Sequence, residues 1–260
     1  MNSGLIHKTA VVDAGAQLGA GVEIGPYACI EAGAVIGDGC RIGPHACVYG
    51  STTLGPGCRV HASAVLGDVP QDTAYETCTS FVRIGRDCVI REGVTIHRGT
   101  KPDTATTVGD GCLLMAFSHL AHNVRLGRGV ILANGVLLAG YVSVDDGAFL
   151  SGNAMVHQFC RVGTLAMMGG GSGVSVDLPP FCTTAPVTMN RLLGLNVVGM
   201  RRAGLAQEER TAVRRAYRAL FQEGRRPADA MARLRADHPA PAVETLCRFV
   251  EQSSRGICRP

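Results

Sequence analysis

Tryptophan is absent from this 260-residue chain, which contains only five tyrosines and seven phenylalanines. So few aromatic side chains argue against a surface that stacks nucleic-acid bases, and we expect no nucleic-acid partner. No two cysteines form a Cys-x-x-Cys pair, so zinc-ribbon and thioredoxin-like motifs are missing. The sequence also shows no apolar stretch long enough to cross a bilayer and no secretory signal pattern. We therefore expect a cytoplasmic protein with reduced thiols and no stable membrane insertion.

Glycine is abundant, and an apolar residue recurs at every sixth position over most of the chain. The positions are Ile6, Val12, Leu18, Ile24, Ile30, Ile36, Ile42, Val48, Leu54, Val60 and Leu66, then Ile84, Ile90 and Ile96, and then every sixth residue from Val108 to Val174. Six residues are too few for a helix and a turn, but they suit one short strand and a tight corner. A fixed short period of this kind is typical of a hexapeptide-repeat solenoid.

A second column lies two residues before each of these positions and consists of small or β-branched residues. Five of them are cysteines, at positions 40, 58, 88, 112 and 160, where cysteine can serve as a compact apolar residue. Two inward columns per hexapeptide predict a narrow prism with a stacked core. The pattern resembles the left-handed parallel β-helix of hexapeptide acyltransferases, in which three hexapeptides form one coil of eighteen residues. The resemblance implies an all-β solenoid of this handedness.

The six-residue pattern is interrupted twice, and we expect looped-out segments near residues 67–83 and 97–107. Loops that leave a rigid scaffold are common places for binding residues, although tolerated surface insertions are the alternative. The pattern ends near residue 180, which predicts a solenoid domain over 1–180 and a C-terminal α-helical domain over 181–260. Residues 206–223 have apolar side chains at helical spacing. We expect two further helices, one beginning at Pro227 and one over 243–250.

Eight arginines fall between residues 201 and 226, while the net charge of the whole chain is only +4. Such a cluster is either a solvated helix face or a docking surface for an acidic partner.

Three histidines occupy positions that the inward columns do not require. Adding eighteen to His122 gives Gly140, and adding eighteen again gives Gln158, so these residues are expected to lie in one column near His119 and His157. A histidine with its ordinary pKa of about 6.5 suits a general base near neutral pH. The Gly140 N–H can stabilise a developing oxyanion, a contribution of about 3 kcal/mol. With no serine or cysteine nucleophile beside them, these residues favour direct acyl transfer to a hydroxyl.

Two other classes of function remain open at this stage. The three histidines could bind zinc between subunits, as in γ-carbonic-anhydrase-like solenoids. Against this, those enzymes space two of their ligands five residues apart, whereas His119 and His122 are three apart. A solenoid scaffold without catalytic activity is the other alternative.

Longer motifs resemble the UDP-N-acetylglucosamine O-acyltransferases that begin lipid A synthesis. The matching segments are residues 90–100, 113–115, 119–122, 131–134, 138–140, 142–146, 156–160 and 169–174, with 70–72 and 196–204 outside the six-residue pattern. The resemblance implies a homotrimer with active sites between subunits, and no metal or redox cofactor. It also implies transfer of a 3-hydroxyacyl chain from acyl carrier protein to the 3-hydroxyl of UDP-N-acetylglucosamine.

The same resemblance assigns roles to individual residues. It makes His122 the general base, Gly140 the oxyanion donor and Gly170 the position that measures acyl-chain length. The substrate-binding residues that it implies are Asp72, His119, Asn123, Tyr141, His157, Gln158, Asn196 and Arg202.

Several positions depart from the family pattern, among them residues 78–80 and 185–187. Asn123 follows the general base where the family usually has an acidic residue, and Tyr141 replaces a common histidine. Ala74 replaces a lysine of the first loop, and Ala203 replaces an arginine of the tail. These departures leave open a paralogous acyltransferase with a different acceptor, either another sugar or an amine.

Overall fold

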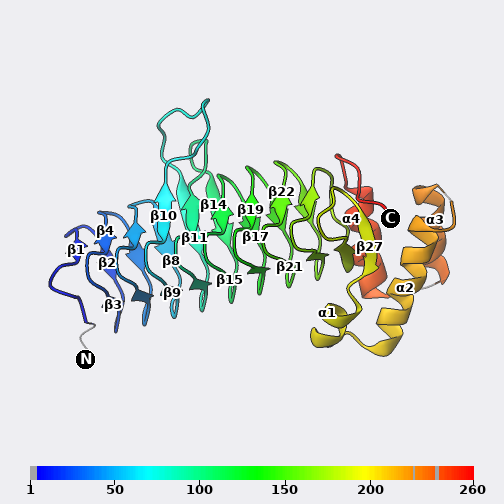
Figure 1. The fold of residues 1–260 in the computed structure, drawn as a ribbon, viewed down its shortest axis with the longest axis horizontal. Coiled ribbons are helices and arrows are strands. Elements are labelled where there is room, and N and C mark those ends of the chain that lie inside the picture. The colour runs from blue at the N-terminus through cyan, green and yellow to red at the C-terminus, as the bar shows by residue number, and fades with distance from the viewer. Residues whose placement is uncertain (1–4, 225, 238–239) are drawn as a thin grey trace.

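The computed structural model describes residues 5–224, 226–237 and 240–260. The chain winds into a three-sided solenoid of short parallel strands, with helices at the C-terminal end (Figure 1). Each side is one sheet, named here by its first strand. The predicted parallel β-helix followed by helices is confirmed.

The strands are distributed among the three sheets in rotation. The β1 sheet contains β1 (Val11–Val12), β4 (Cys29–Ile30), β7 (Cys47–Val48), β10 (Val65–Asp68), β13 (Thr95–His97), β16 (His119–Leu120), β19 (Leu137–Leu138), β22 (Met155–Val156) and β25 (Gly173–Val174). The β2 sheet contains β2 (Gln17–Leu18), β5 (Val35–Ile36), β8 (Thr52–Leu54), β11 (Phe81–Ile84), β14 (Ala105–Val108), β17 (Arg125–Leu126), β20 (Ser143–Val144) and β23 (Arg161–Val162). The β3 sheet contains β3 (Glu23–Ile24), β6 (Arg41–Ile42), β9 (Arg59–Val60), β12 (Val89–Ile90), β15 (Leu113–Leu114), β18 (Ile131–Leu132), β21 (Phe149–Leu150), β24 (Met167–Met168), β26 (Cys182–Thr184) and β27 (Leu192–Leu195).

The two inward columns form the core of the solenoid. Apolar residues at every sixth position, such as Ile36, Leu66 and Leu132, are almost fully buried, because alternate residues of a strand face opposite sides of its sheet. The five cysteines of the second column are buried too. Four of them donate their S–H to a backbone carbonyl of the neighbouring coil at 3.1–3.2 Å, so they pack as apolar residues with a satisfied donor.

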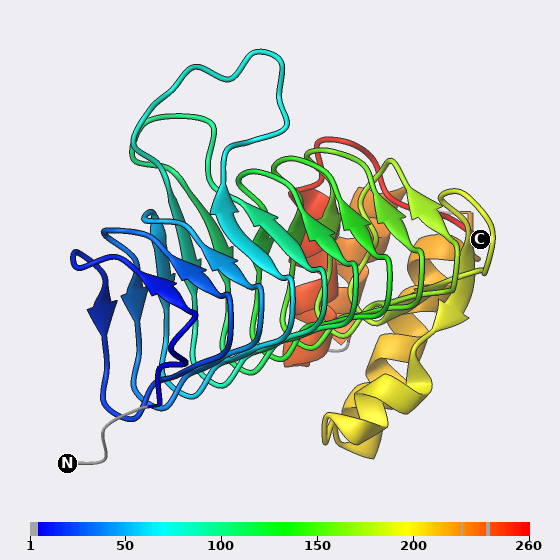
Figure 2. The same cartoon turned by 60° about the vertical axis from the view of Figure 1, so that its left-hand side comes forward.

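Two loops project from one corner of the solenoid (Figure 2). Strand partners are usually eighteen residues apart, but Val65 pairs with Thr95 and Thr95 pairs with His119. The intervals of thirty and twenty-four residues show that the loops add whole hexapeptides. The inward positions therefore keep their phase on both sides of each loop.

The loops are shorter than the sequence indicated. The segments outside the strands are residues 69–80 and 98–104, because β10, β11, β13 and β14 extend into the predicted loops. The two loops also contact each other: Ser80 Oγ donates to Gly99 O at 2.6 Å, and Arg98 donates to Tyr75 Oη at 3.1 Å.

The helical region begins later than predicted. The β3 sheet still contains residues 182–184 and 192–195, since β26 continues it and β27 pairs antiparallel with β26. The helices are α1 (Val197–Arg202), α2 (Gln207–Phe221), α3 (Pro227–Asp237) and α4 (Pro241–Glu251). The guanidinium of Arg161 joins the last coils to α4 through an ion pair with buried Asp177 at 3.0 Å and a bond to Phe249 O at 2.7 Å.

Candidate active site

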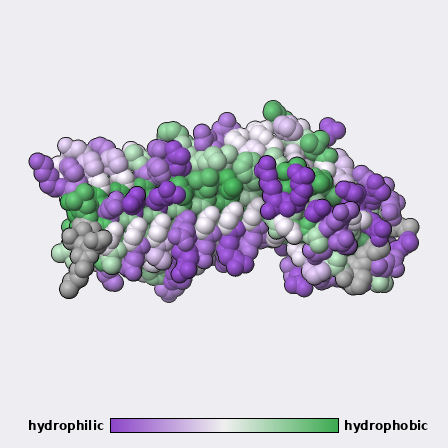
Figure 3. All heavy atoms as spheres, turned by 90° about the horizontal axis from the view of Figure 1, so that it is seen from below, coloured by the Kyte–Doolittle hydropathy of each residue, from purple (hydrophilic) through white to green (hydrophobic). Residues whose placement is uncertain are grey.

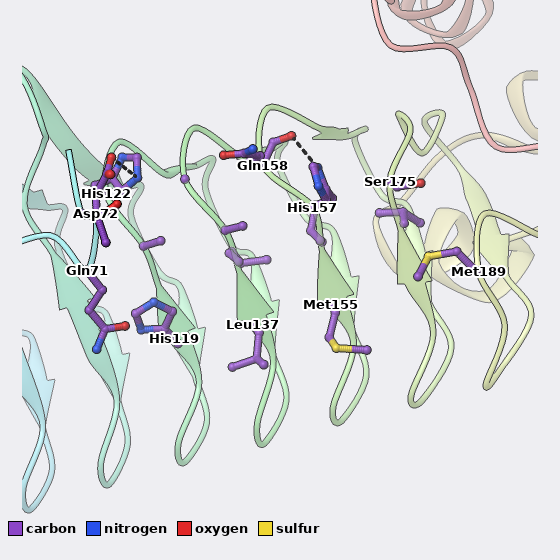
Figure 4. Close-up of a pocket in the computed structure, with 17 residues that line it drawn as sticks. Gln71, Asp72, His119, His122, Leu137, Met155, His157, Gln158, Ser175 and Met189 are labelled. Atoms are coloured by element: carbon purple, nitrogen blue, oxygen red, sulfur yellow. Dashed lines mark hydrogen bonds and ion pairs between the residues drawn. The ribbon is translucent and has the colours of Figure 1, made fainter. Parts of the chain in front are cut away.

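A groove of about 840 Å³ lies along the β1 sheet and the corner that leads from it to the β2 sheet (Figure 4). We call this edge the His122 corner; it consists of residues 122–123, 140–141 and 158–159 in successive coils. Its lining residues are Gln71, Asp72 and Thr73 from the first loop, and His119, Ala121, His122, Leu137, Leu138, Ala139, Gly140, Met155, Val156, His157, Gln158, Val174, Ser175 and Met189 from the coils.

The predicted column of His122, Gly140 and Gln158 is present in the fold. Tyr141 N–H donates to His122 O, and Phe159 N–H donates to Gly140 O, each at 3.0 Å, so the three turns are stacked. Asn123, Tyr141 and Phe159 have φ values of 59°, 60° and 64°. This left-handed conformation is uncommon for large side chains, and it turns the chain sharply at each coil.

Gly140 allows the imidazole of His122 to lie directly against the backbone of the next coil. A Cβ atom at position 140 would stand 2.4 Å from His122 Cε1, closer than any side chain tolerates. The Gly140 N–H makes no hydrogen bond to any part of the chain that the structure describes. A glycine amide beside an imidazole is thus available to a bound oxyanion.

The His122 imidazole is enclosed, with 13% of its side chain exposed. Its Nδ1 lies 3.1 Å from Asn123 Oδ1, and its Nε2 lies 3.8 Å from Asp72 Oδ2. Asp72 is oriented by its own loop, because the Ala74 N–H donates to Asp72 Oδ1 at 2.9 Å. Asp72 therefore points its second oxygen at His122, as Figure 4 shows.

His119 is suited to a different task. Its Nδ1 lies 2.7 Å from Thr95 Oγ1, and its ring meets that of His97 edge to face at 5.0 Å. Burial, with a smaller effect from His97, lowers the pKa of His119 to about 4. Since its imidazole is neutral at pH 7 and a weak base, His119 is better suited to hydrogen-bond a substrate than to remove a proton.

His157 and Gln158 form the more open side of the groove. Both side chains are exposed, and His157 Nδ1 lies 3.2 Å from Gln158 O. Their position above the groove in the next coil suits contact with a polar ligand.

The floor of the groove is apolar. Leu137 and Met155 point outward from neighbouring strands of the β1 sheet and are 45% and 46% exposed. Gly173 follows them in register, and a Cβ there would lie 2.9 Å from the Cε and Sδ atoms of Met189. Met189 therefore covers Gly173 and stands at one end of the apolar floor.

Five residues of the predicted set do not line this groove within one chain. Asn123 and Tyr141 contact His122 at its edge, and the other three lie farther away. Asn196 and Arg202 line a separate cavity of about 680 Å³ beside the β3 sheet, and Ala203 lines it too. The Asn196 side chain caps α1: its Oδ1 accepts from Gly199 N–H, and its Nδ2 donates to Leu165 O, each at 2.9 Å. Gly170 does not line the groove; it occupies the corner before β25, where a Cβ would meet only Gly152 O at 3.8 Å.

Some residues of the site escaped the sequence analysis. Met189 follows the end of the six-residue pattern, so nothing in the spacing placed it over Gly173. Thr100 belongs to a matched motif, but its bonds to Asn123 and Tyr141 depend on how the second loop folds back.

The arginines of the tail are spread over several surfaces. Arg215, Arg218 and Arg233 line a cavity of about 450 Å³ between α2 and α3, while Arg225 lies outside the described residues. Among residues 5–224, 226–237 and 240–260, no three histidine, cysteine or acidic side chains come together as a metal site. No helix of the described chain combines the length and apolar character that a bilayer crossing requires.

Two family models match separate parts of the chain. Residues 4–37, 33–68 and 105–140 match the bacterial transferase hexapeptide model, which comprises six repeats. Residues 177–258 match the second domain of UDP-N-acetylglucosamine O-acyltransferases. The chain is therefore a transferase of the hexapeptide-repeat class.

Full-length relatives narrow this class further. An acyl-[acyl-carrier-protein]–UDP-N-acetylglucosamine O-acyltransferase of Alkalilimnicola ehrlichii is 50% identical, and the match covers 98% of this chain and 99% of that protein. The same enzyme of Pseudomonas aeruginosa is 43% identical over 98% and 99%. The solved structure of LpxA, a UDP-N-acetylglucosamine acyltransferase from Bacteroides fragilis, superimposes with a TM-score of 0.93 at 36% identity, covering 97% of this chain and 99% of that one. This chain belongs to the acyl-[acyl-carrier-protein]–UDP-N-acetylglucosamine O-acyltransferase family.

Proposed function

We propose that this chain transfers a 3-hydroxyacyl group from acyl carrier protein to the 3-hydroxyl of UDP-N-acetylglucosamine, the first step of lipid A synthesis. The observation that carries the proposal is the pairing of the His122 imidazole with the Gly140 N–H above an apolar groove. Family membership supports the same activity.

The chemistry needs only groups of the chain. His122 Nε2 takes the proton of the sugar hydroxyl while its oxygen attacks the thioester carbonyl. The Gly140 N–H donates to the oxyanion of the tetrahedral intermediate. The intermediate then expels the pantetheine thiolate, which receives the proton from the imidazolium. No covalent acyl-enzyme forms and no metal or redox cofactor takes part.

Replacing His122 by alanine tests the role of the base. We expect the turnover of 3-hydroxyacyl carrier protein with UDP-N-acetylglucosamine, followed by mass spectrometry, to fall at least about 100-fold. His45→Ala is the matched control, because His45 is exposed at another corner, on the N-terminal coils. Turnover near that of the unchanged protein in His122→Ala would contradict the assignment.

Within the groove, Asp72, His119, His157 and Gln158 surround the space beside His122 and are proposed to bind the sugar nucleotide. The apolar floor is proposed to hold the acyl chain. Gly170 does not line the groove within one chain, so its proposed role in measuring acyl-chain length requires the acyl chain to run along a groove between subunits.

A homotrimer is proposed because one chain separates the predicted binding residues. Asn196 and Arg202 lie beside the β3 sheet, so a second subunit is needed to bring them to the groove on the β1 sheet. The outward residues of the β3 sheet support this, since Leu113, Ile131 and Phe149 are apolar and only half-buried. Figure 3 shows an apolar band along the solenoid on the face seen from below. Large apolar surfaces of this kind usually mark protein interfaces.

Mixed trimers test whether the site is shared. His122→Ala and Arg202→Ala chains, each weakly active alone, are co-expressed with different tags and purified through both. Recovery of activity in the mixed trimer is expected, because some sites then receive an intact His122 and an intact Arg202 from different subunits. An inactive mixed trimer, or a monomer in sedimentation equilibrium, would contradict the shared site.

The acyl carrier protein is proposed to dock near the arginines of the tail, with the protein in the cytoplasm. The exposed arginines of α1 and α2 favour an acidic partner. All eleven cysteines are free in the described residues.

A different acceptor is the second candidate, and it rests on specific departures. Ala74 contributes only its backbone N–H to the turn that orients Asp72, and Ala203 places no charge in the second cavity. A mass-spectrometric screen of UDP-sugars with a 3-hydroxyl or a 3-amine distinguishes the two candidates. Preference for the amine would replace the first one.

A further inference from the structure

We propose that Thr100, Asn123 and Tyr141 form a hydrogen-bonded relay that holds His122 in the tautomer with its hydrogen on Nδ1. They are positioning residues in this view, and for Asn123 and Tyr141 this replaces the substrate-binding role that the family resemblance implied. The proposal rests on the proposed function of His122 as the general base, and it explains how the base is oriented without the acidic neighbour.

The direction of the relay is set by a backbone amide. Thr100 N–H donates to Asn123 Oδ1 at 3.1 Å. A backbone N–H can only donate, so the amide of Asn123 must present its oxygen, not its nitrogen, at this point. Asn123 is buried, with 7% of the residue exposed, and its backbone N–H donates to Thr106 Oγ1 at 2.8 Å. The residue is therefore held in place at both its side chain and its backbone.

The hydroxyl groups follow from that orientation. Thr100 Oγ1 lies 3.0 Å from the same Asn123 Oδ1, which is an acceptor only, so the threonine hydroxyl donates. Its single hydrogen is then used. Tyr141 Oη lies 2.9 Å from Thr100 Oγ1, and the tyrosine must therefore be the donor in that bond. The chain of donors runs from Tyr141 through Thr100 to Asn123.

The imidazole completes the sequence. His122 Nδ1 lies 3.1 Å from Asn123 Oδ1, and two ring nitrogens of a neutral histidine cannot both donate. Because Oδ1 only accepts, Nδ1 bears the hydrogen and Nε2 bears the lone pair. Nε2 is the atom that faces Asp72 and the groove, so the relay presents the basic nitrogen to the acceptor hydroxyl.

The positive charge that the His122 imidazole gains on protonation is not stabilised by residue 123, as it would be if that residue were a carboxylate. Three donors converge on Asn123 Oδ1, but the amide has no net charge to stabilise the imidazolium. The carboxylate of Asp72 is 3.8 Å from Nε2 and provides that charge from the other side of the ring. Orientation and charge, which a single carboxylate supplies together, are divided here between the relay and the loop.

The relay is tested with Thr100→Val, which removes the hydroxyl and keeps the backbone N–H, and with Thr100→Ser, which restores the hydroxyl. Tyr141→Phe removes the first donor. Tyr27→Phe is the matched control, since Tyr27 has a similar φ of 58° at a corner far from the groove. We expect kcat to fall about threefold to tenfold in Thr100→Val and less in Tyr141→Phe, with KM for the sugar nucleotide unchanged. Thr100→Ser should regain most of the loss.

Asn123→Asp provides a pH readout. A carboxylate beside Nδ1 favours the protonated imidazole, so the acidic limb of the kcat/KM profile should move to higher pH by about one unit. Nitrogen-15 spectra of labelled histidine, with the His122 signal assigned by its loss in His122→Ala, give a test that needs no activity. We expect the Nδ1–H tautomer in the unchanged protein and a mixture of tautomers in Thr100→Val.

An Nε2–H tautomer in the unchanged protein would overturn the relay even if His122 is the base. A rise of KM with unchanged kcat in Thr100→Val and Tyr141→Phe would also overturn it, because the residues would then bind substrate. A fully active His122→Ala variant would instead remove the proposed function and leave the tautomer measurement standing.

Discussion

The inward columns and the His122 corner are built on the same backbone repeat. The columns repeat the same kind of residue, whereas the corner carries a different residue in each coil. Inside the solenoid, apolar residues return every six positions and are interchangeable in kind, as Ile36, Leu66 and Leu132 illustrate. At the corner, one position per coil is occupied in turn by His122, Gly140 and Gln158.

The difference separates stability from chemistry. A core position contacts similar neighbours in every coil, so each one contributes to stacking in the same way. A corner position meets a different residue in the next coil, and a site arises where unlike residues are stacked. Changes in the columns should therefore affect folding, and changes at the corner should affect catalysis.

The largest expected effect is a loss of stability, and it tests whether the inward columns serve folding alone. Leu132 is fully buried in the β3 sheet, away from the groove. Leu132→Ala should lower the free energy of unfolding by about 2–5 kcal/mol, measured by urea denaturation, because it removes buried methyl groups and leaves a cavity. The kcat of the folded fraction should stay unchanged; a selective loss of kcat would break the separation.

Gly140→Ala tests whether the His122 corner serves catalysis and not folding. A Cβ atom would lie 2.4 Å from His122 Cε1, so the imidazole must move or the backbone must shift. We expect kcat to fall about 100-fold, comparable to the loss of an oxyanion donor, with an unfolding midpoint close to that of the unchanged protein. Gly152→Ala is the matched control, because its Cβ would meet only Asn134 O at 3.5 Å, an ordinary van der Waals contact. Equal activity of the two variants would contradict the close approach.

The pH dependence of stability tests His119, which lies in β16 between the two regions and lines the groove. Burial lowers the pKa of His119 to about 4, below its ordinary value of 6.5. Between pH 6.5 and 4 the unfolded chain binds the proton and the folded one does not, so the free energy of unfolding falls as the pH falls through this range. Above pH 6.5 neither state is protonated and this loss is absent.

The measurement compares urea denaturation at pH 7 and pH 5. His119→Gln should lose less stability on acidification than the unchanged protein, by roughly 1 kcal/mol or more. His45→Gln, at an exposed position, should lose as much as the unchanged protein. Equal losses in all three proteins would show that His119 is not buried as a neutral ring.

The smallest expected effect concerns the end of the groove. Met189→Ala should uncover Gly173 and shift donor preference toward longer acyl chains, and Gly170→Met should shift it toward shorter ones. Each buried methylene contributes about 0.8 kcal/mol, so a several-fold change in the ratio of kcat/KM values is expected. Competition between acyl carrier proteins of different chain length measures it. An altered profile in Met189→Ala alone would place the end of the groove at Met189 and not at Gly170.

Much of the fold was predictable because the repeat is local. Each hexapeptide specifies one strand and one corner, and both loops add whole hexapeptides, so the phase survives the interruptions at residues 69–80 and 98–104. The helices expected over 206–223, from Pro227 and over 243–250 correspond to α2, α3 and α4. The expected boundary at residue 181 comes before β26 and β27, which lack the six-residue pattern: β26 pairs with β24, and β27 pairs with β26. The short helix α1 was not predicted, and its cap depends on a bond from Asn196 to Leu165 O.

Only those site residues that are related by the eighteen-residue interval could be placed from the sequence. The eighteen-residue interval placed His122, Gly140 and Gln158 in one column before any contact was known. The same interval does not predict the positions of Asp72, Thr100 and Met189, because they approach the column from segments outside the repeat.

The sequence by itself determined the coil, its inward columns and the order of residues along each corner, because a periodic chain allows only one register in which its apolar side chains are buried. Only the tertiary structure decided which side chains face the two ring nitrogens of His122, with Asn123 Oδ1 beside Nδ1 and Asp72 Oδ2 beside Nε2. Those properties depend on side chains from two loops that meet the corner in space, and no period relates them to it.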